Sequence, residues 1–177
     1  TDIVIPDSVT SIGNSAFAGC VKLKSVVIPT GVTDFGEHMF WGCTDLADES
    51  GLVIIHGTLY SCVDDRDSVT IPKDVTHIGD GAFAGCGDLT DITIPDNVTS
   101  IGRGAFSRCE FLDSITLPDS ITSIGEKAFW RCSCLTSITI PVHVTHIELE
   151  TFAECKRLAN VIIPEGVTNI GEQAFRW

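Results

Sequence analysis

Cysteine is the residue type whose spacing in this 177-residue chain could most readily do chemistry. Cysteines that recur at one repeat position could build a disulfide ladder or a thiolate metal site. The C-x2-C pairs typical of zinc sites are absent, however. Thiols on stacked repeats would lie about 5 Å apart, beyond the Cβ separation of about 3.8 Å in a disulfide. We therefore predict a column of small buried thiols, with Cys62 and Cys134 outside it and unable to meet each other. Six of the eight cysteines form the column, spaced by 23 residues and once by 43: Cys20, Cys43, Cys86, Cys109, Cys132 and Cys155.

Histidine offers no better case for a metal or catalytic site. His143 and His146 are three residues apart, but in an extended chain such side chains diverge. His77 and His146 share a repeat position and would be about 15 Å apart. A nucleophile elbow, a phosphate loop and a dinucleotide fingerprint are all missing, although a carboxylate pair could still form across adjacent repeats. We predict no enzymatic activity, no catalytic or metal-binding residue and no cofactor.

The charge balance excludes two classes of partner. The chain has 24 acidic and 11 basic residues, a formal net charge of −13, so it repels phosphate backbones and anionic lipid headgroups. The longest aliphatic run is 52–55, far short of the roughly 20 residues of a membrane span. We therefore expect no nucleic-acid binding and no membrane insertion. No signal peptide is visible, and we expect the chain to be part of a longer protein.

An internal repeat positions all of these residues. Aligned on proline, the unit reads x-x-I-x-I-P-x-x-V-T-x-I-G-x-x-A-F-x-x-C-x-x-L, most cleanly over 90–112. Proline ends a strand because it cannot donate to the ladder, so every copy should turn at the same corner. All seven prolines mark this 23-residue period: Pro6, Pro29, Pro72, Pro95, Pro118, Pro141 and Pro164.

Apolar spacing changes along the unit. Ile92 and Ile94 alternate as in a strand with one buried face, and the segment 98–101 suits a second extended stretch. Gly102 can supply a left-handed or tight bend. The segment 105–109 has helical spacing and predicts about one turn of α- or 3₁₀-helix.

A unit this short cannot bury its apolar side alone, so copies must stack. We predict a single leucine-rich-repeat solenoid over 1–177, with a parallel β-sheet on the concave side and short helical turns on the convex side. A threonine recurring at Thr10 and in every later copy should bond along the stack. In the sixth copy Glu148 replaces the glycine and Thr151 the alanine, which predicts a distorted bend. The expected repeats are 1–23, 24–46, 67–89, 90–112, 113–135, 136–158 and 159–177.

The segment 47–66 interrupts the period. Two β-rich runs flank His56-Gly57, and glycine in a two-residue connection suits a primed hairpin turn. The acidic stretch 64–67 would then lead into the next repeat. We predict a β-hairpin insertion whose role is either to pack one widened turn or to contact a ligand, because insertions in solenoids often lie on a binding face.

The repeat pattern resembles the BspA-like, or Treponema pallidum-type, class of leucine-rich repeats over nearly the whole chain. That resemblance implies a secreted or cell-surface, adhesin-like module that binds a host, matrix or cell-surface protein, or a glycan. A structural spacer without its own ligand and an enzyme-associated module are the alternatives. Because neither end carries an obvious polar cap, end-to-end self-association of the chain is also expected.

Candidate partner-binding residues are those that the repeat does not require. Trp41 and Trp130 share a position where other copies have alanine, serine or arginine, and exposed aromatic side chains can anchor partners; packing over a neighbouring turn is the alternative. Small polar and β-branched side chains should line the exposed strand face, where they either fill the sheet surface or bind a partner. The remaining candidates are Thr70, Asp91, Thr93, Ser114, Thr116, Ser137 and Thr139 on the strands, and His56 and Tyr60 in the hairpin.

Overall fold

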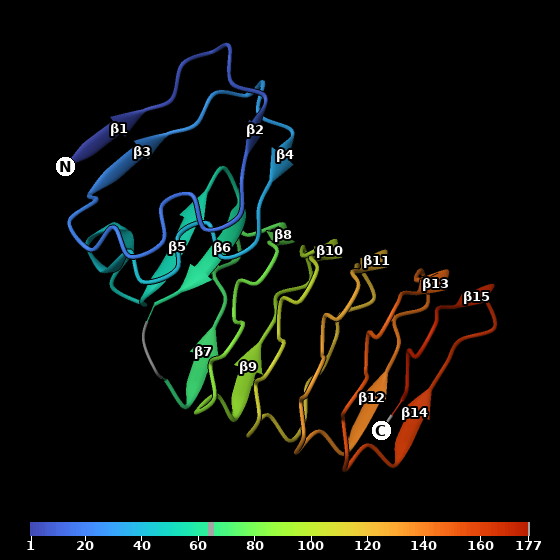
Figure 1. Cartoon of the computed structure of the whole chain (residues 1–177). Helices are drawn as coiled ribbons and strands as arrows, with labels where there is room; N and C mark the ends of the chain where they lie inside the picture. Colours follow the sequence, from blue (N-terminus) through green and yellow to red (C-terminus); the bar gives the residue numbers. More distant parts are fainter. Residues whose placement is uncertain (64–65, 177) are drawn as a thin grey trace.

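The computed structural model describes residues 1–63 and 66–176. Asp64 and Asp65, which belong to the predicted insertion, and Trp177, at the end of the predicted seventh repeat, lie outside these ranges. The chain forms a β-solenoid of about seven turns with parallel sheets (Figure 1). The first strands of the turns are β1 (Asp2–Val4), β3 (Ser25–Val27), β7 (Ser68–Thr70), β9 (Asp91–Thr93), β12 (Ser137–Thr139) and β14 (Asn160–Ile162). The second strands are β2 (Ser11–Ile12), β4 (Asp34–Phe35), β8 (His77–Ile78), β10 (Ser100–Ile101), β11 (Ser123–Ile124), β13 (His146–Ile147) and β15 (Asn169–Ile170).

The strand register follows the 23-residue period. In the pair β7–β9, Val69 lies opposite Ile92 and Thr70 opposite Thr93. The middle residue of each strand is buried and its neighbours are exposed, as alternation on a half-buried sheet requires. The predicted corner is also present, since the backbone N–H of Val98 donates to the carbonyl of Pro95. The equivalent bond in every turn is 3.0–3.2 Å long.

Turns, rather than a helix, follow the second strand in each copy. In the fourth copy the N–H groups of Ala105, Ser107 and Cys109 each donate to the carbonyl three residues earlier. Gly104 and Arg108 have φ values of 57° and 61°, and a left-handed residue ends a right-handed helix. The expected helical turn is thus divided into successive tight turns. The 3₁₀-helix η1 (Thr44–Leu46) is the one helix in 1–63 and 66–176.

Glycine at the bend serves a close approach, and Gly102 is not among the residues with positive φ, so the left-handed alternative suggested for it is wrong. A Cβ atom built on Gly102 would lie 2.7 Å from the backbone nitrogen of Asp80, and one on Gly125 would lie 2.6 Å from that of Arg103. Real Cβ atoms do not come so near, so the preceding turn leaves room for hydrogen alone. The left-handed residue stands two positions later, as at Lys127 (φ 57°).

Phenylalanine forms the spine of the core. Phe83, Phe106, Phe129, Phe152 and Phe175 stack on one another with ring centroids 5.1 to 5.4 Å apart and planes within 10° of parallel. Stacked identical side chains are what a fixed repeat period places at equivalent positions. The rings of all but the last are fully buried, so each turn rests on the next through an aromatic ring.

The predicted column of buried thiols is confirmed for five of its six members, and the structure gives its reason. The Sγ of Cys109 donates to the carbonyl of Phe83, 3.2 Å away, and the Sγ of Cys132 to that of Phe106, 3.1 Å away. Cys155 repeats the contact with Phe129, whereas Cys20 in the first turn is exposed. Cysteine is therefore a small apolar side chain with a donor aimed at the preceding turn.

Part of the threonine column bonds along the stack as predicted, whereas the hydroxyl of Thr145 bonds to Nδ1 of the adjacent His146. The hydroxyl of Thr99 donates to the carbonyl of Thr76, that of Thr122 to Thr99, and that of Thr168 to Thr145, each over 3.2 Å. These side-chain bonds run beside backbone bonds between the same residues. Threonine recurs because its hydroxyl satisfies a carbonyl of the neighbouring turn.

The sixth copy carries the expected distortion. The second-strand ladder joins β8, β10 and β11, but β13 pairs with β15 in a separate sheet. Glu148 occupies the position at which Gly102, Gly125 and Gly171 have no space for a Cβ atom, so the interruption falls where a side chain enters the closely packed bend. Thr151 is buried, and its hydroxyl donates to the carbonyl of Glu148 over 2.9 Å.

The insertion is a β-hairpin, as predicted, and it separates two hydrophobic cores. β5 (Leu52–Ile55) and β6 (Thr58–Cys62) pair antiparallel, and β6 continues the parallel ladder onto β8. One face, including Leu59, packs into the core of the later turns, and the other, including Tyr60, into the core of the first two turns. Figure 1 shows the first two turns tilted away from the row of later turns, with the hairpin at the junction.

Candidate functional site

The exposed strand face carries most of the residues singled out from the sequence. Parallel register places their side chains in rows along the stack, as expected for equivalent positions of a solenoid. Residues 114–116 of the fifth turn form no strand, so the row continues there without ladder pairing. The exposed members are Thr70, Asp91, Thr93, Ser114, Thr116, Ser137 and Thr139.

Two of these residues, Thr70 and Thr93, line an open groove of about 560 Å³ at the proline corner. Lys73 and Asp96 supply one charge of each sign to its wall, and Asn97 braces it by donating from Nδ2 to the carbonyls of Lys73 and Val75. Two hydroxyls, an ammonium and a carboxylate above an apolar floor can form hydrogen bonds of either polarity. The other lining residues are Ile71, Ile94 and Pro95.

Trp41, in the second turn, faces a hollow shared with the end of the hairpin and the third turn, and 59% of its surface is exposed. The hollow has a volume of about 190 Å³. Small side chains and the end of β6 line that hollow, which leaves the indole free to pack against a partner. The lining residues are Gly42, Cys62, Val63, Ala84, Gly85 and Cys86.

Trp130 has a different environment although it shares the repeat position of Trp41. The guanidinium carbon of Arg131 lies 4.4 Å from the ring centroid and that of Arg108 lies 5.2 Å away. Both distances are within the range of cation–π contact. The ring is only partly exposed, so Trp130 packs against its neighbours and presents arginine to solvent.

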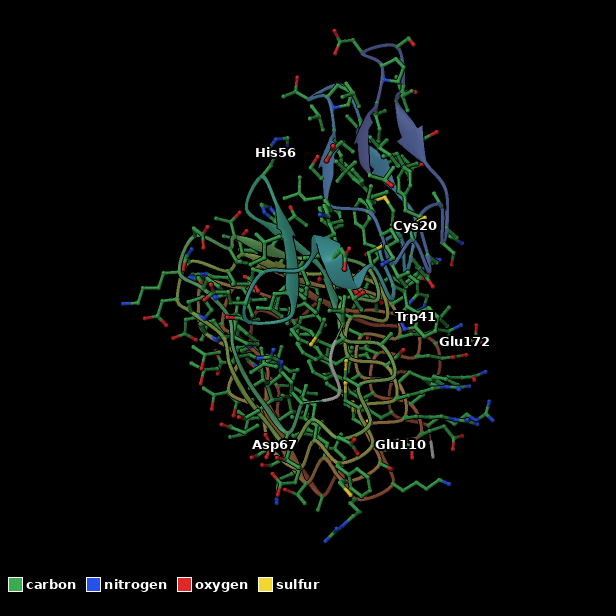
Figure 2. The ribbon with its side chains drawn as sticks, turned by 90° about the vertical axis from the view of Figure 1, so that its left-hand side faces the viewer. Cys20, Trp41, His56, Asp67, Glu110 and Glu172 are labelled. Atoms are coloured by element: carbon green, nitrogen blue, oxygen red, sulfur yellow. The ribbon has the colours of Figure 1, made fainter. Side chains whose placement is uncertain are left out.

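The two candidate residues in the hairpin differ in exposure. His56 is exposed at the tip of the hairpin, where it and Gly57 have φ values of 49° and 75°, and Figure 2 shows it far from Trp41. Tyr60 is 9% exposed and its ring lies 5.4 Å from Phe35 and 5.9 Å from Phe40. Burial raises the pKa of its phenol. Tyr60 is a core residue, and we leave it out of the candidate surface.

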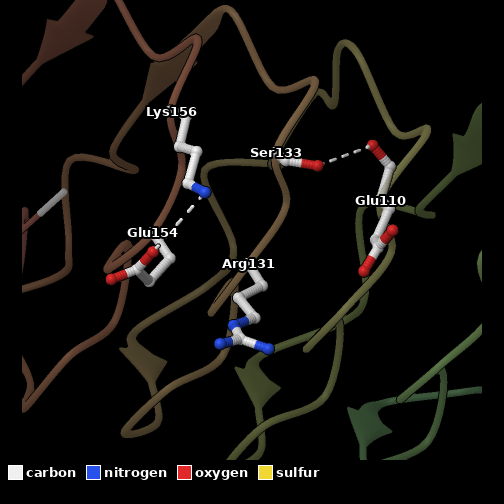
Figure 3. Close-up of a pocket in the computed structure, with 5 residues that line it drawn as sticks. All are labelled: Glu110, Arg131, Ser133, Glu154 and Lys156. Carbon is white, nitrogen blue, oxygen red and sulfur yellow. Dashed lines mark hydrogen bonds and ion pairs between the residues drawn. The ribbon is translucent and has the colours of Figure 1, made fainter.

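A surface that the sequence reasoning missed lies on the turn side of the later repeats. Arg131 lines a hollow of about 310 Å³ together with Glu110, Ser133, Glu154 and Lys156 (Figure 3). Lys156 forms an ion pair with Glu154 over 4.0 Å, and the Ser133 hydroxyl donates to the carbonyl of Glu110 over 3.4 Å. The sequence does contain a pattern that could have indicated this surface. The residue before each column cysteine is glycine in the early copies and arginine in the middle ones.

Ionisable groups elsewhere have structural explanations. Burial, then the nearby carboxylates of Glu37 and Asp34, raises the pKa of Asp80, while the backbone N–H of Arg103 lowers it. Arg103 in turn bridges Glu37, 3.2 Å away, and Glu126, 2.9 Å away. Burial also raises the pKa of the column thiols, which disfavours the thiolate that a nucleophile requires.

Within 1–63 and 66–176, no three or more histidine, cysteine or acidic side chains are grouped so that they could hold a metal ion. In the same ranges no helix is long and apolar enough to cross a membrane. The arrangement found instead is a set of open hollows rimmed by hydroxyls, guanidinium groups and an indole. Such surfaces recognise other molecules through hydrogen bonds, charge and aromatic packing.

Solved structures of similar proteins come from several bacteria. The leucine-rich-repeat protein of Treponema pallidum is 30% identical with a TM-score of 0.59, over 96% of this chain and 72% of that one. A leucine-rich cell surface protein of Faecalibacterium prausnitzii is 24% identical with a TM-score of 0.55, over 91% and 59%. A leucine-rich-repeat protein of Eubacterium ventriosum is 23% identical with a TM-score of 0.57, over 99% and 64%. The chain thus spans less than two thirds of the latter two proteins.

A comparison with curated proteins found no match. The family description that matches is "BspA type Leucine rich repeat region (6 copies)", over residues 1–50 and 53–177. The two matched stretches leave out only 51 and 52, at the start of the hairpin that breaks the period. The chain therefore belongs to the BspA-type leucine-rich-repeat family.

Proposed function

We propose that this chain is a non-enzymatic recognition module, exposed on the cell surface or secreted, that binds a partner protein through its strand face. The observation that carries the proposal is the groove at Thr70 and Thr93, the largest of the hollows described above at about 560 Å³. Its hydroxyls belong to the exposed rows, so a bound segment can extend from the groove along the stack. The Faecalibacterium relative, described as a cell surface protein, supports the proposed location.

A protein partner fits this face better than a glycan does. The groove has an apolar floor of Ile71, Ile94 and Pro95 with polar groups at its edge, which is how protein interfaces are built. It has no aromatic side chain on which a sugar ring could stack. The flat rows beyond it offer the adaptable hydrogen bonds that a peptide backbone can use.

The test is a binding screen against extracellular matrix proteins, cell-surface proteins and glycans by surface plasmon resonance. The double variant Thr70→Arg/Thr93→Arg fills the groove with long side chains from exposed positions. Ser123→Arg is the matched control, because Ser123 is an exposed hydroxyl on β11, outside both the groove and the row of first strands. A Trp41→Ala variant probes the hollow at Trp41 separately.

Saturable binding of a protein that the groove variant loses and the control keeps supports the proposal. Saturable binding of a glycan alone, or equal binding by all variants, contradicts it. No saturable binding in the whole panel favours the spacer alternative. Robust turnover in a hydrolase panel would overturn the non-enzymatic assignment.

A further inference from the structure

The residue before each column cysteine has a left-handed backbone. Gly19, Gly42 and Gly85 occupy this position in the first three turns, with φ values of 71° to 81°. Arg108 and Arg131 occupy it in the next two, with φ values of 61° and 60°. Residues with a side chain rarely adopt this conformation. The chain thus places two long cationic side chains, one turn apart, where its own earlier repeats use glycine.

Backbone contacts fix both arginines. The N–H of Arg108 donates to the carbonyl of Trp130 over 2.7 Å, and that of Arg131 to the carbonyl of Ala153 over 2.9 Å. Each guanidinium group then rests over the ring of Trp130. A guanidinium group that lies over an aromatic ring keeps its N–H donors at its edge, where they can reach an acceptor. The three side chains form a preorganised set of donors, which we name the Arg–Trp clamp (Arg108, Trp130 and Arg131).

The clamp has no carboxylate of its own. Among residues 1–63 and 66–176, no acidic side chain lies within 4.0 Å of either guanidinium group, while neighbouring cations are matched: Lys127 with Glu150 over 3.7 Å and Lys156 with Glu154 over 4.0 Å. The unmatched arginines are notable in a chain of net charge −13. These neighbouring ion pairs neutralise one another, and the two arginines outnumber the one unpaired carboxylate among the described residues of the adjoining hollow, that of Glu110, so the clamp is left as a local site of positive charge.

Two adjoining hollows open at Arg131. One, of about 310 Å³, is the hollow of Figure 3, with Glu110, Ser133 and Lys156 on its wall. The other, of about 210 Å³, is lined by Trp130, Arg131 and Arg176, and by Glu150 and Glu154, whose carboxylates pair with Lys127 and Lys156. Each has the size of one or two side chains rather than of a folded loop. A single acceptor group entering either hollow meets the edge of the Arg131 guanidinium.

We propose that the Arg–Trp clamp binds one carboxylate side chain, an aspartate or glutamate on an exposed segment of a partner protein. Arginine pairs with carboxylates in a two-bond geometry that is stronger than a neutral hydrogen bond. A sugar is disfavoured because arginines cover the Trp130 ring. A polyanion such as a sulfated glycan is disfavoured because Glu110 and Glu154 at the rim repel closely spaced negative charges. This surface is separate from the strand face, so the inference does not depend on the groove.

The experiment uses a blocked five-residue peptide with a central glutamate among glycine and serine, and its glutamine counterpart. The ¹⁵N-labelled chain is titrated, and the indole N–H of Trp130 and the Nε–H of Arg131 are followed by NMR. Arg131→Gly removes the side chain at a position where Gly19, Gly42 and Gly85 show that glycine fits. Arg157→Gln is the matched control, since it removes the same charge from a side chain outside both hollows.

We expect saturable shifts with the glutamate peptide, weakened about tenfold or more in Arg131→Gly and unchanged in Arg157→Gln. A Glu110→Gln variant should bind more tightly, because a repelling charge leaves the rim. Equal shifts with the glutamine peptide, no shift with either peptide, or retained binding by Arg131→Gly would overturn the proposal. Tighter binding of inorganic phosphate or of a sulfated oligosaccharide than of the peptide would overturn the protein-carboxylate assignment. None of these results bears on strand-face binding, which is tested by the groove variants.

Discussion

Replacing Gly102 by alanine tests whether close packing of successive bends holds the stack together. The added Cβ atom would lie 2.7 Å from the backbone nitrogen of Asp80 and from the carbonyl carbon of Gly79. Backbone atoms cannot swing aside as a flexible side chain can, so the two turns must separate. Separation stretches the hydrogen bond from the Gly102 N–H to the Ile78 carbonyl, which is 2.7 Å long.

The expected loss follows from these contacts. Overpacking of a filled core costs about 1–3 kcal/mol, and losing one net backbone hydrogen bond costs about 0.5–1.5 kcal/mol. Alanine also reduces the entropy of the unfolded chain, which offsets about 0.4–1 kcal/mol. We therefore expect Gly102→Ala to lower the free energy of unfolding by roughly 2–3 kcal/mol.

Gly13 supplies the matched control. It occupies the same repeat position in the first turn, where a Cβ atom would meet nothing within 4 Å. Gly13→Ala should therefore be neutral or slightly stabilising, by up to about 1 kcal/mol. Urea unfolding followed by far-UV circular dichroism measures both variants. Equal effects of the two substitutions would refute close approach as the reason for glycine at this position.

Three further predictions follow from the same contacts. Glu148→Gly should raise the free energy of unfolding by about 1 kcal/mol, since it lets the ladder close between β11 and β13; an unchanged urea midpoint would contradict this. Asp80→Asn should raise the urea midpoint at pH 7, because burial disfavours the charged carboxylate. The amide oxygen can still accept the N–H of Arg103, as the side chain of Asn14 accepts the N–H of Glu37 in the next turn. A lower urea midpoint at pH 7 argues against this explanation. Burial raises the pKa of Cys155 to about 12, so the folded chain retains a proton that the unfolded chain loses. The contribution of Cys155 to stability should then be intact below pH 9 and fall by up to about 1.4 kcal/mol per pH unit between 9 and 12. Cys155→Ala should reduce the slope of stability against pH by that amount in urea titrations at successive pH values.

The period made much of the fold predictable. A fixed 23-residue spacing forces equivalent residues into columns, so the buried cysteines and the bonded threonines could be predicted without coordinates. The corner after each first strand was predictable because proline has no backbone N–H to donate to the strand ladder. The hairpin was predictable from local turn chemistry at His56 and Gly57, whose φ values are both positive.

Other features depend on contacts between turns, which the pattern of one repeat does not contain. Helical spacing over 105–109 was interpreted as a helical turn, but the left-handed residues Gly104 and Arg108 divide it. The role of Gly102 depends on the backbone of the preceding turn. Tyr60 was a surface candidate because the sequence does not show that β6 has a hydrophobic core on each face.

The two tryptophans show how the same repeat position acquires different environments. Trp41 is followed by Gly42 and has Gly19 at the corresponding place in the preceding turn, so no side chain at that position covers its ring. Trp130 is followed by Arg131 and preceded by Arg108, and both guanidinium groups lie over it. The exposure of each indole is therefore decided by the left-handed position beside it, where glycine leaves an aromatic surface open and arginine converts it into a cationic one. Substituting that neighbour, rather than the tryptophan, is the direct way to exchange the two kinds of surface.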